Sequence, residues 1–195
     1  MAEFMDRRSA TYHSGALVYS FGGYLVGFVG ILHESLWVNF IALFLLGHAM
    51  VIAAYMVHEC SHNTVFLSNS DNARLGEVLL WVVGSNYGTY EDIRYKHFRH
   101  HVDNDDVVWF DYEAFFKRHP FVLNITKALE WCYIPAHCLI MHLVTMLSGF
   151  LIPERRDQRP RNLVVILLRG GLFVLLCCLN AKAGLLYVLA YIMMV

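Results

Sequence analysis

Apolar stretches long enough to cross a lipid bilayer constrain this chain more than any other feature. Residues 15–32 and 36–57 form two such stretches, and the short turn at residues 33–35 separates them. A helix needs about 20 predominantly apolar residues to cross the hydrocarbon core. Hydrophobic residues make up 57% of the 195 and charged residues 16%, against about 25% charged in an ordinary soluble domain. We therefore predict an all-α fold, a polytopic integral membrane helical bundle that forms one domain over residues 1–195.

The distribution of charge predicts the orientation of these spans and excludes one class of partner. Arg7 and Arg8 precede the first span, whereas the turn at residues 33–35 contains neither lysine nor arginine. Because basic residues concentrate in cytoplasmic loops, we expect the N-terminus and the end of the second span to face the cytoplasm. The net charge of −1 argues against a nucleic-acid partner, which would require a basic surface.

We expect the middle of the chain to lie on the same side of the membrane as the end of the second span. Residues 75–88 are apolar but too short to cross, which predicts an interfacial or re-entrant helix. Residues 90–120 are polar, aromatic and rich in carboxylates. We expect this polar segment to stay on the cytoplasmic side with the end of the second span.

The last third of the sequence allows two topologies. Residues 125–152 are long enough to cross, and residues 153–161 contain four arginines. If those arginines are cytoplasmic, residues 163–195 form a hairpin with a tight turn at 180–184, and residues 125–152 do not cross. We favour this interpretation over the alternative in which residues 125–152 cross.

Five histidines in two tight clusters indicate a metal centre. The first histidine cluster is His58 and His62 in HECSH, and the second is His97, His100 and His101 in HFRHH. On a helix, residues four apart share a face, and positions i, i+3 and i+4 lie within roughly 100° of arc. Histidine is the commonest metal ligand in proteins. Both clusters could therefore direct their imidazoles at one point beside the membrane.

The first cluster also matches the HExxH pattern of zinc proteases, in which Glu59 would be the general base. Two observations favour another kind of centre. The second cluster supplies more histidines than a single zinc with an open position needs, and no third ligand follows His62 at the usual short spacing. Five or more imidazoles indicate two metal ions, and imidazole suits iron as well as zinc.

The order of the two clusters resembles that of the membrane fatty-acid desaturase superfamily. Members of that family carry three histidine boxes, and HECSH followed about 35 residues later by HFRHH matches the first two. The stretch HECSHNTVF is similar to first boxes of the acyl-lipid and sphingolipid branches. The resemblance implies a di-iron centre, with two iron ions, O₂ as co-substrate and these metal ligands among others: His58, His62, His97, His100 and His101. The third box is missing, since no histidine follows His142.

The reaction that the resemblance implies is the O₂-dependent introduction of a double bond into a lipid acyl chain. An alkyl C–H bond offers no acid or base handle, so the cofactor carries the chemistry and the protein binds and orients. Hydroxylation of the same chain is the rival reaction, and a truncated, non-catalytic membrane protein is the alternative from another class. Because no haem or iron–sulfur motif is visible in the sequence, we expect a separate electron donor of ferredoxin or cytochrome type.

Several polar residues are candidates for supporting roles. Glu59, Asp92 and Asp103 flank the clusters, and one or two of them could accept the second imidazole N–H of a metal-bound histidine. A solvated acidic loop is the alternative for each. His137 and His142 are candidates for lining the site.

Two further histidines are given other roles by the sequence. His48 lies ten residues before His58, roughly 15 Å along a helix, so we expect it to form a hydrogen bond inside the bundle. His13 is expected at the surface.

The chain stops at Tyr-Ile-Met-Met-Val, within an apolar stretch. We expect the source gene to continue past Val195 for on the order of 100 residues, which would complete a domain of ordinary size. The third box would lie there, and the 195 residues alone would be inactive.

Overall fold

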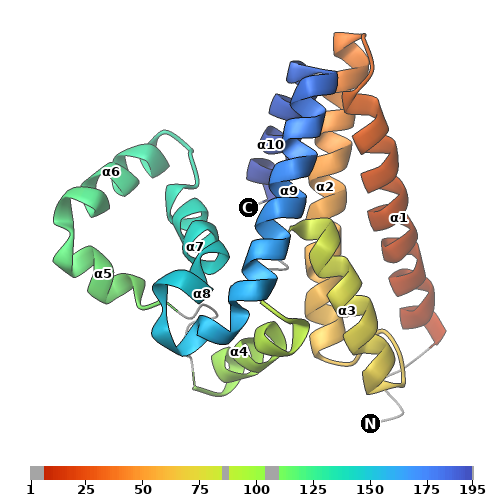
Figure 1. The fold of residues 1–195 in the computed structure, drawn as a ribbon. Coiled ribbons are helices and arrows are strands. Elements are labelled where there is room, and N and C mark those ends of the chain that lie inside the picture. The colour runs from red at the N-terminus through yellow and green to blue at the C-terminus, as the bar shows by residue number, and fades with distance from the viewer. Residues whose placement is uncertain (1–6, 85–87, 104–109, 195) are drawn as a thin grey trace.

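The computed structural model describes residues 7–84, 88–103 and 110–194, and every regular element among them is a helix (Figure 1). The predicted all-α membrane bundle is confirmed. Three helical stretches are long and apolar enough to cross a membrane, namely Thr11–Ile31, Leu36–Ser61 and Pro153–Leu179. The first two coincide with the spans predicted from the sequence.

The bundle consists of four helices that run side by side in Figure 1. They are α1 (Arg7–Ile31), α2 (Leu36–Ser61), α9 (Arg159–Leu179) and α10 (Ala181–Met194). Two glycines let α1 approach α2 closely. A Cβ atom on Gly27 would lie 2.8 Å from the Cβ of Leu46, and one on Gly30 would lie 2.6 Å from the Cβ of Ala42. Small residues at such a crossing are a typical device for packing helices in a membrane.

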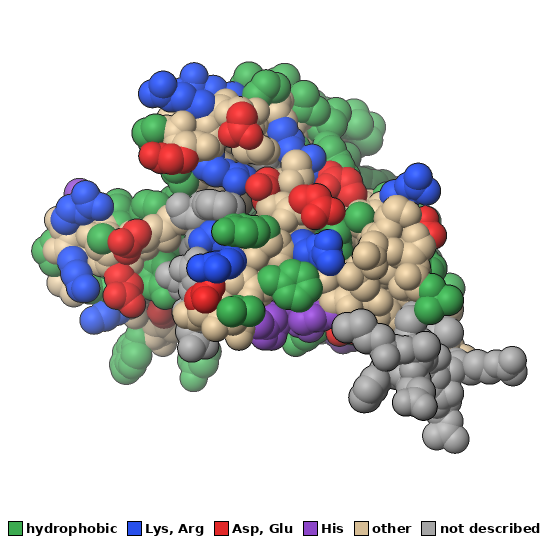
Figure 2. Space-filling model, turned by 90° about the horizontal axis from the view of Figure 1, so that it is seen from below, with side chains coloured by type: hydrophobic (Ala, Val, Ile, Leu, Met, Phe, Trp, Pro, Cys, Tyr) green, Lys and Arg blue, Asp and Glu red, His purple; other side chains and the backbone are tan. Residues whose placement is uncertain are grey.

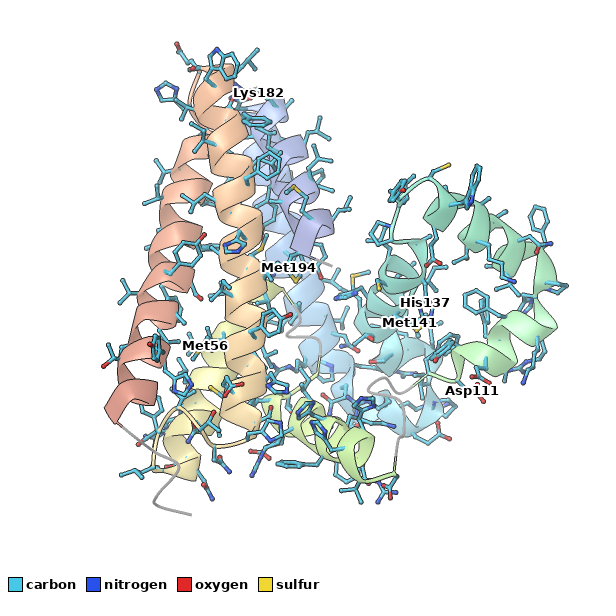
Figure 3. The ribbon with its side chains drawn as sticks, turned by 180° about the vertical axis from the view of Figure 1, so that it is seen from behind. Met56, Asp111, His137, Met141, Lys182 and Met194 are labelled. Carbon is cyan, nitrogen blue, oxygen red and sulfur yellow. The ribbon has the colours of Figure 1, made fainter. Side chains whose placement is uncertain are left out.

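One end of the bundle holds the α1–α2 turn and the α9–α10 turn together. The Lys182 ammonium donates to the carbonyl oxygens of His33 (3.0 Å) and Glu34 (3.3 Å), and Figure 3 shows Lys182 at this end. The predicted hairpin of residues 163–195 is therefore present. Its turn is shorter than expected: of residues 180–184 only Asn180 lies outside a helix, and its side-chain oxygen accepts from the backbone N–H of Lys182 (3.0 Å).

The opposite end of the bundle carries α3 (Asn69–Val83) and α4 (Tyr90–Asp103). The helix expected over residues 75–88 begins earlier, because the Ser68 hydroxyl caps it by accepting from the backbone N–H of Asp71 (3.3 Å). It ends at Gly84, whose φ of +78° suits a left-handed helix cap. α3 packs against the C-terminal half of α2. It has 15 residues and is not one of the helices long enough to cross a membrane.

Beside the bundle, a lobe of short helices joins α4 to α9 (Figure 1). Residues 125–152 lie in this lobe and do not form one helix, because the chain turns at Tyr133 (φ +61°) and Pro135 then precedes a new helix. No single helix of these residues could cross a bilayer, which agrees with the favoured topology. The lobe comprises α5 (Tyr112–Arg118), α6 (Pro120–Trp131), α7 (Ala136–Met146) and α8 (Ser148–Leu151), followed by the 3₁₀ helix η2 (Pro153–Gln158).

Candidate metal centre

The first histidine cluster occupies the end of α2. His58 lies on the last turn, and His62 caps the helix by donating its backbone N–H to the carbonyl oxygens of His58 and Cys60. Asn63 then adopts a positive φ of 55°, which turns the chain away from the helix axis. Because the two histidines are four residues apart, their rings lie on one side of this helix end, with centroids 4.7 Å apart.

The second histidine cluster reaches the same point from α4. His97 lies with its ring centroid 4.5 Å from that of His58 and 4.8 Å from that of His62. His101, one turn further along α4, has its ring centroid 4.5 Å from that of His97. Figure 2 shows histidines gathered on this end of the molecule, next to charged side chains of both signs.

The ligand nitrogens of four histidines converge closely enough to bind one metal ion. One nitrogen each from His58, His62, His97 and His101 lies within 4.8 Å of all the others. The Nε2 atom of His97 is 2.8 Å from that of His62 and 3.0 Å from that of His101. Two nitrogens bound at about 2.1 Å to one ion, at right angles to each other, lie about 3.0 Å apart. The spacing therefore matches adjacent positions around a single ion.

The electrostatics of the cluster favour the neutral imidazole, which is the form that binds metals, at two of these residues, His97 and His62. Burial, followed by the neighbouring imidazoles of His58, His62 and His101, lowers the pKa of His97 to about 4. The pKa of His62 is also lowered, first by burial and then by His58 and His101. A metal ion therefore meets little competition from protons near neutral pH.

Glu59 lies beside the cluster with both of its carboxylate oxygens engaged. Its Oε1 is 3.2 Å from the Nδ1 of His58, and its Oε2 accepts from the hydroxyl of Thr64 (2.7 Å). The Nε2 of His13 lies 3.8 Å from the same Oε2, and the His13 side chain is only 16% exposed. The expectation that His13 is a surface residue is therefore wrong. His48 forms the predicted hydrogen bond, since its Nδ1 is 2.7 Å from the hydroxyl of Tyr19, but its side chain is exposed and does not lie inside the bundle.

Three residues that the sequence predicts to bind the metal or to support its ligands lie elsewhere or pair with other residues. His100 lies on α4 outside the four-histidine group, with its ring centroid 5.9 Å from that of His101. Asp92 forms its ion pair with Arg155, not with a histidine. Asp103 pairs with Arg99, which lies one turn earlier on α4 (2.7 Å).

The two histidines proposed to line the site lie on α7, in the lobe. The ring of His137 packs against those of Tyr112 (4.9 Å) and Phe116 (6.0 Å), and Figure 3 shows it apart from Met56 on α2. His142 bonds through Nδ1 to the carbonyl oxygen of Cys138 (2.9 Å). Neither belongs to the four-histidine group.

Sequence reasoning missed the side chains that join α4 to the rest of the molecule. Arg94 donates through Nε to the carbonyl oxygen of Ser61 (3.2 Å), the last residue of α2, and so bridges the two histidine-bearing helices. A cation at a helix C-terminus is favourable. The sequence signal for this contact is the position of Arg94, one turn before His97 on the same helix. From the sequence, Arg155 is most simply a topology signal; in the structure it is buried against Asp92.

A comparison with known protein families agrees with this geometry. A family model described as fatty acid desaturase matches residues 35–195, which include both histidine clusters. The chain belongs to the fatty acid desaturase family. No match is found among curated proteins or among solved structures. The family match begins at the α1–α2 turn, so α1 and its His13 lie outside the matched region.

The donor set suits the metal that the desaturase resemblance implies. Four imidazole nitrogens, with no thiolate or carboxylate in the group, are compatible with iron as well as with zinc. The four nitrogens account for one ion. A second ion would need ligands beyond these four, of which His100 is the nearest candidate along α4.

Proposed function

We propose that this desaturase-family chain binds iron through His58, His62, His97 and His101 and acts on the acyl chain of a membrane lipid, introducing a double bond. The observation that carries the proposal is the convergence of four imidazole nitrogens from two helices within 4.8 Å. The family match supports the same chemistry. When bound, iron would supply the O₂-dependent oxidation of an alkyl C–H bond, with electrons from a separate donor of ferredoxin or cytochrome type.

The residues around the histidines would orient them. The Nδ1–H of His58 is placed to donate to Glu59, which would leave Nε2 of that ring for the metal. Thr64 donates to the other oxygen of Glu59 and so restricts the rotation of the carboxylate. We assign His100 to a second ion of a di-iron centre, together with ligands that lie outside this group.

The position of the centre suits a substrate delivered by the bilayer. The first histidine cluster lies at the end of an apolar span of 26 residues, so a lipid chain beside α2 could reach the metal without leaving the membrane. Four arginines lie at residues 153–161, in the first turns of the span Pro153–Leu179, and Arg7 and Arg8 precede the span Thr11–Ile31. By the positive-inside rule we assign this end to the cytoplasm.

A zinc protease is less compatible with the geometry. That mechanism needs a carboxylate oxygen of Glu59 free to take a proton from a metal-bound water. Here one oxygen faces His58 and the other is bonded to Thr64.

The test is to measure bound iron in this chain, and lipid products in cells that express the full source gene, with the same set of variants. His62→Ala and His101→Ala should lower the iron content and abolish acyl-chain oxidation. His119→Ala is the matched control, because His119 is an exposed histidine of the lobe. Gas chromatography of lipids from expressing cells separates a new double bond from a new hydroxyl group. Full iron content in both cluster variants, or stoichiometric zinc with peptidase activity, would overturn the proposal.

A further inference from the structure

Three arginines on η2 and α9 each contact the segment that connects the two histidine clusters. Arg155 lies on η2, and Arg161 and Arg169 lie on α9. Their partners in this segment are Asp92, Glu77 and Trp81, on α3 and in the first turn of α4. The contacts cross 63 to 88 positions of the sequence, so chain proximity does not explain them.

Arg155 forms the best defined of these contacts. Its two terminal nitrogens donate to the two carboxylate oxygens of Asp92, at 3.1 and 3.2 Å. The Arg155 side chain is 9% exposed and that of Asp92 is 23% exposed. The backbone N–H and the hydroxyl of Thr89 also donate to Asp92 (3.1 and 3.0 Å). A bidentate pair of this kind fixes direction as well as distance, and it fixes the first turn of α4.

Arg161 extends the connection to α3. It forms an ion pair with Glu77, whose other carboxylate oxygen accepts from the backbone N–H of Tyr90 (3.0 Å). Glu77 therefore joins α9, α3 and the first residue of α4 through one carboxylate. The N-terminus of α4 is favourable for this negative charge.

Arg169 holds the far end of α3. Its guanidinium donates to the carbonyl oxygen of Trp81, in the last turn of α3, and to the hydroxyl of Tyr187 (2.7 Å). Carbonyl groups at a helix end lack partners within the helix, and a cation there supplies one. This contact fixes the end of the short helix against the span.

These contacts matter because α4 has little apolar packing of its own. Tyr90 is its one buried residue among residues 90–103. The direction of His97 and His101 therefore depends on polar contacts, namely those that hold the first turn of α4 and the contact of Arg94 with the end of α2. If these contacts only stabilised the fold, losing one would leave metal binding by the folded protein unchanged. If they position α4, losing one would weaken metal binding by the folded protein.

We propose that Arg155, Arg161 and Arg169 are positioning residues that hold α3 and α4 so that the second histidine cluster faces the first. The inference rests on the proposed metal centre. Arg155 is expected to act most strongly, because its partner Asp92 lies on the histidine-bearing helix itself.

The test measures binding of Co²⁺, followed by its visible absorption, in the purified full chain in detergent. Arg155→Met removes the charge and keeps much of the volume. Arg155→Lys keeps the charge without the bidentate geometry. Arg156→Met is the matched control, because Arg156 is exposed on the same 3₁₀ helix. Asp92→Asn and the double variant Asp92→Asn/Arg155→Met complete a double-mutant cycle.

The expected result is specific for the pair. Arg155→Met should weaken Co²⁺ binding by about 10-fold or more, the lower limit of losses seen when support of a metal ligand is removed. Arg155→Lys should recover part of the loss, and Arg156→Met should bind like the wild type. The double variant should bind no more weakly than the weaker single variant. Binding within twofold of wild type in both Arg155→Met and Asp92→Asn would overturn the inference.

Amide hydrogen exchange separates this inference from the proposed function. In Arg155→Met, residues 90–103 should exchange faster while residues 42–57 of α2 keep their wild-type rates. If the wild-type chain failed to bind Co²⁺, the proposed metal centre would fail, and faster exchange confined to residues 90–103 would still support positioning of α4. Equal rates in α4 of wild type and variant would reject positioning whatever the metal result.

Discussion

The two helices that carry the proposed metal centre are held in different ways. α2 is a span whose buried residues run along its whole length, from Asn39 to Ser61. α4 is a 14-residue polar helix in which Tyr90 is the one buried residue. Packing against α1, α3 and α10 fixes the first histidine cluster. Hydrogen bonds and ion pairs at the end of the bundle fix the second.

This difference indicates which half of the centre is preformed. Lipid tails are as apolar as the buried side chains of α2, so close van der Waals packing along its whole length holds this span in the bundle. α4 has no comparable packing and is held by a few polar contacts, such as the Asp92–Arg155 ion pair. We therefore expect α2 to keep its position without metal, and α4 to be the element that depends on its polar contacts and on the metal.

The largest effect is expected from His97→Ala. His97 has its ring nitrogen within 3.0 Å of those of His62 and His101, so it is the central ligand of the group. Its loss should abolish tight metal binding while leaving the span α2 folded. Co²⁺ titration and far-ultraviolet circular dichroism check the two halves of this expectation. Tight binding retained by His97→Ala would mean that the four nitrogens do not act together.

Glu59→Gln is expected to have the next largest effect. The amide would keep the shape of Glu59 but would place a weaker acceptor beside Nδ1 of His58. Loss of such support typically costs about 10–100-fold in metal affinity. The measurement is the apparent dissociation constant for Co²⁺, with Glu34→Gln as a control at the opposite end of the bundle. An unchanged constant would show that Glu59 does not orient His58.

The sequence was sufficient for the half of the molecule that is held by apolar packing. The spans, the helical spacing of His58 and His62, and the lipid-side location all follow from the length of the apolar stretches and the 3.6-residue repeat. The grouping of His58 with His62 and of His97 with His101 could be predicted for the same reason, since local spacing sets which imidazoles share a helix face.

The sequence was insufficient for the half that is held by polar contacts between distant residues. From the sequence, Asp92 could belong to a solvated acidic loop or accept a hydrogen bond from a metal-bound histidine. Its partner Arg155 lies 63 positions away, and only the fold brings the two together. His13 was missed for the same reason, because its neighbour Glu59 lies on another helix. Residues 125–152 looked long enough to span, but the positive φ of Tyr133 could not be read from composition.

Gly76→Ala should disturb α4 and spare α2. A Cβ atom on Gly76 would lie 2.2 Å from the ring of Tyr90, the one buried residue of α4. The ring must shift, at a cost of about 1–3 kcal/mol, and part of that cost should appear as weaker metal binding. Gly22→Ala is the matched control, since nothing lies within 4 Å of its added Cβ. Thermal unfolding and Co²⁺ titration of both variants are compared; equal results for the two would place Tyr90 outside the support of the centre.

The smallest expected effect is a loss of stability in acid that depends on Asp92. Arg155 and the N–H and hydroxyl of Thr89 outweigh burial and hold the pKa of Asp92 below its ordinary value. The ion pair therefore stabilises the folded state fully at pH values above the ordinary aspartate pKa of about 4. The stabilisation is lost as the pH falls further, through the lower pKa of the folded state, because the unfolded chain takes up the proton first. Asp92→Asn removes this contribution, so the difference in unfolding temperature between wild type and variant should be constant from pH 7 to 5 and shrink below pH 4. Asp71→Asn is the control, because Asp71 is half exposed and pairs with Arg74 on its own helix. A difference that stayed constant down to pH 3 would show that the Asp92–Arg155 pair does not hold α4 through its charge.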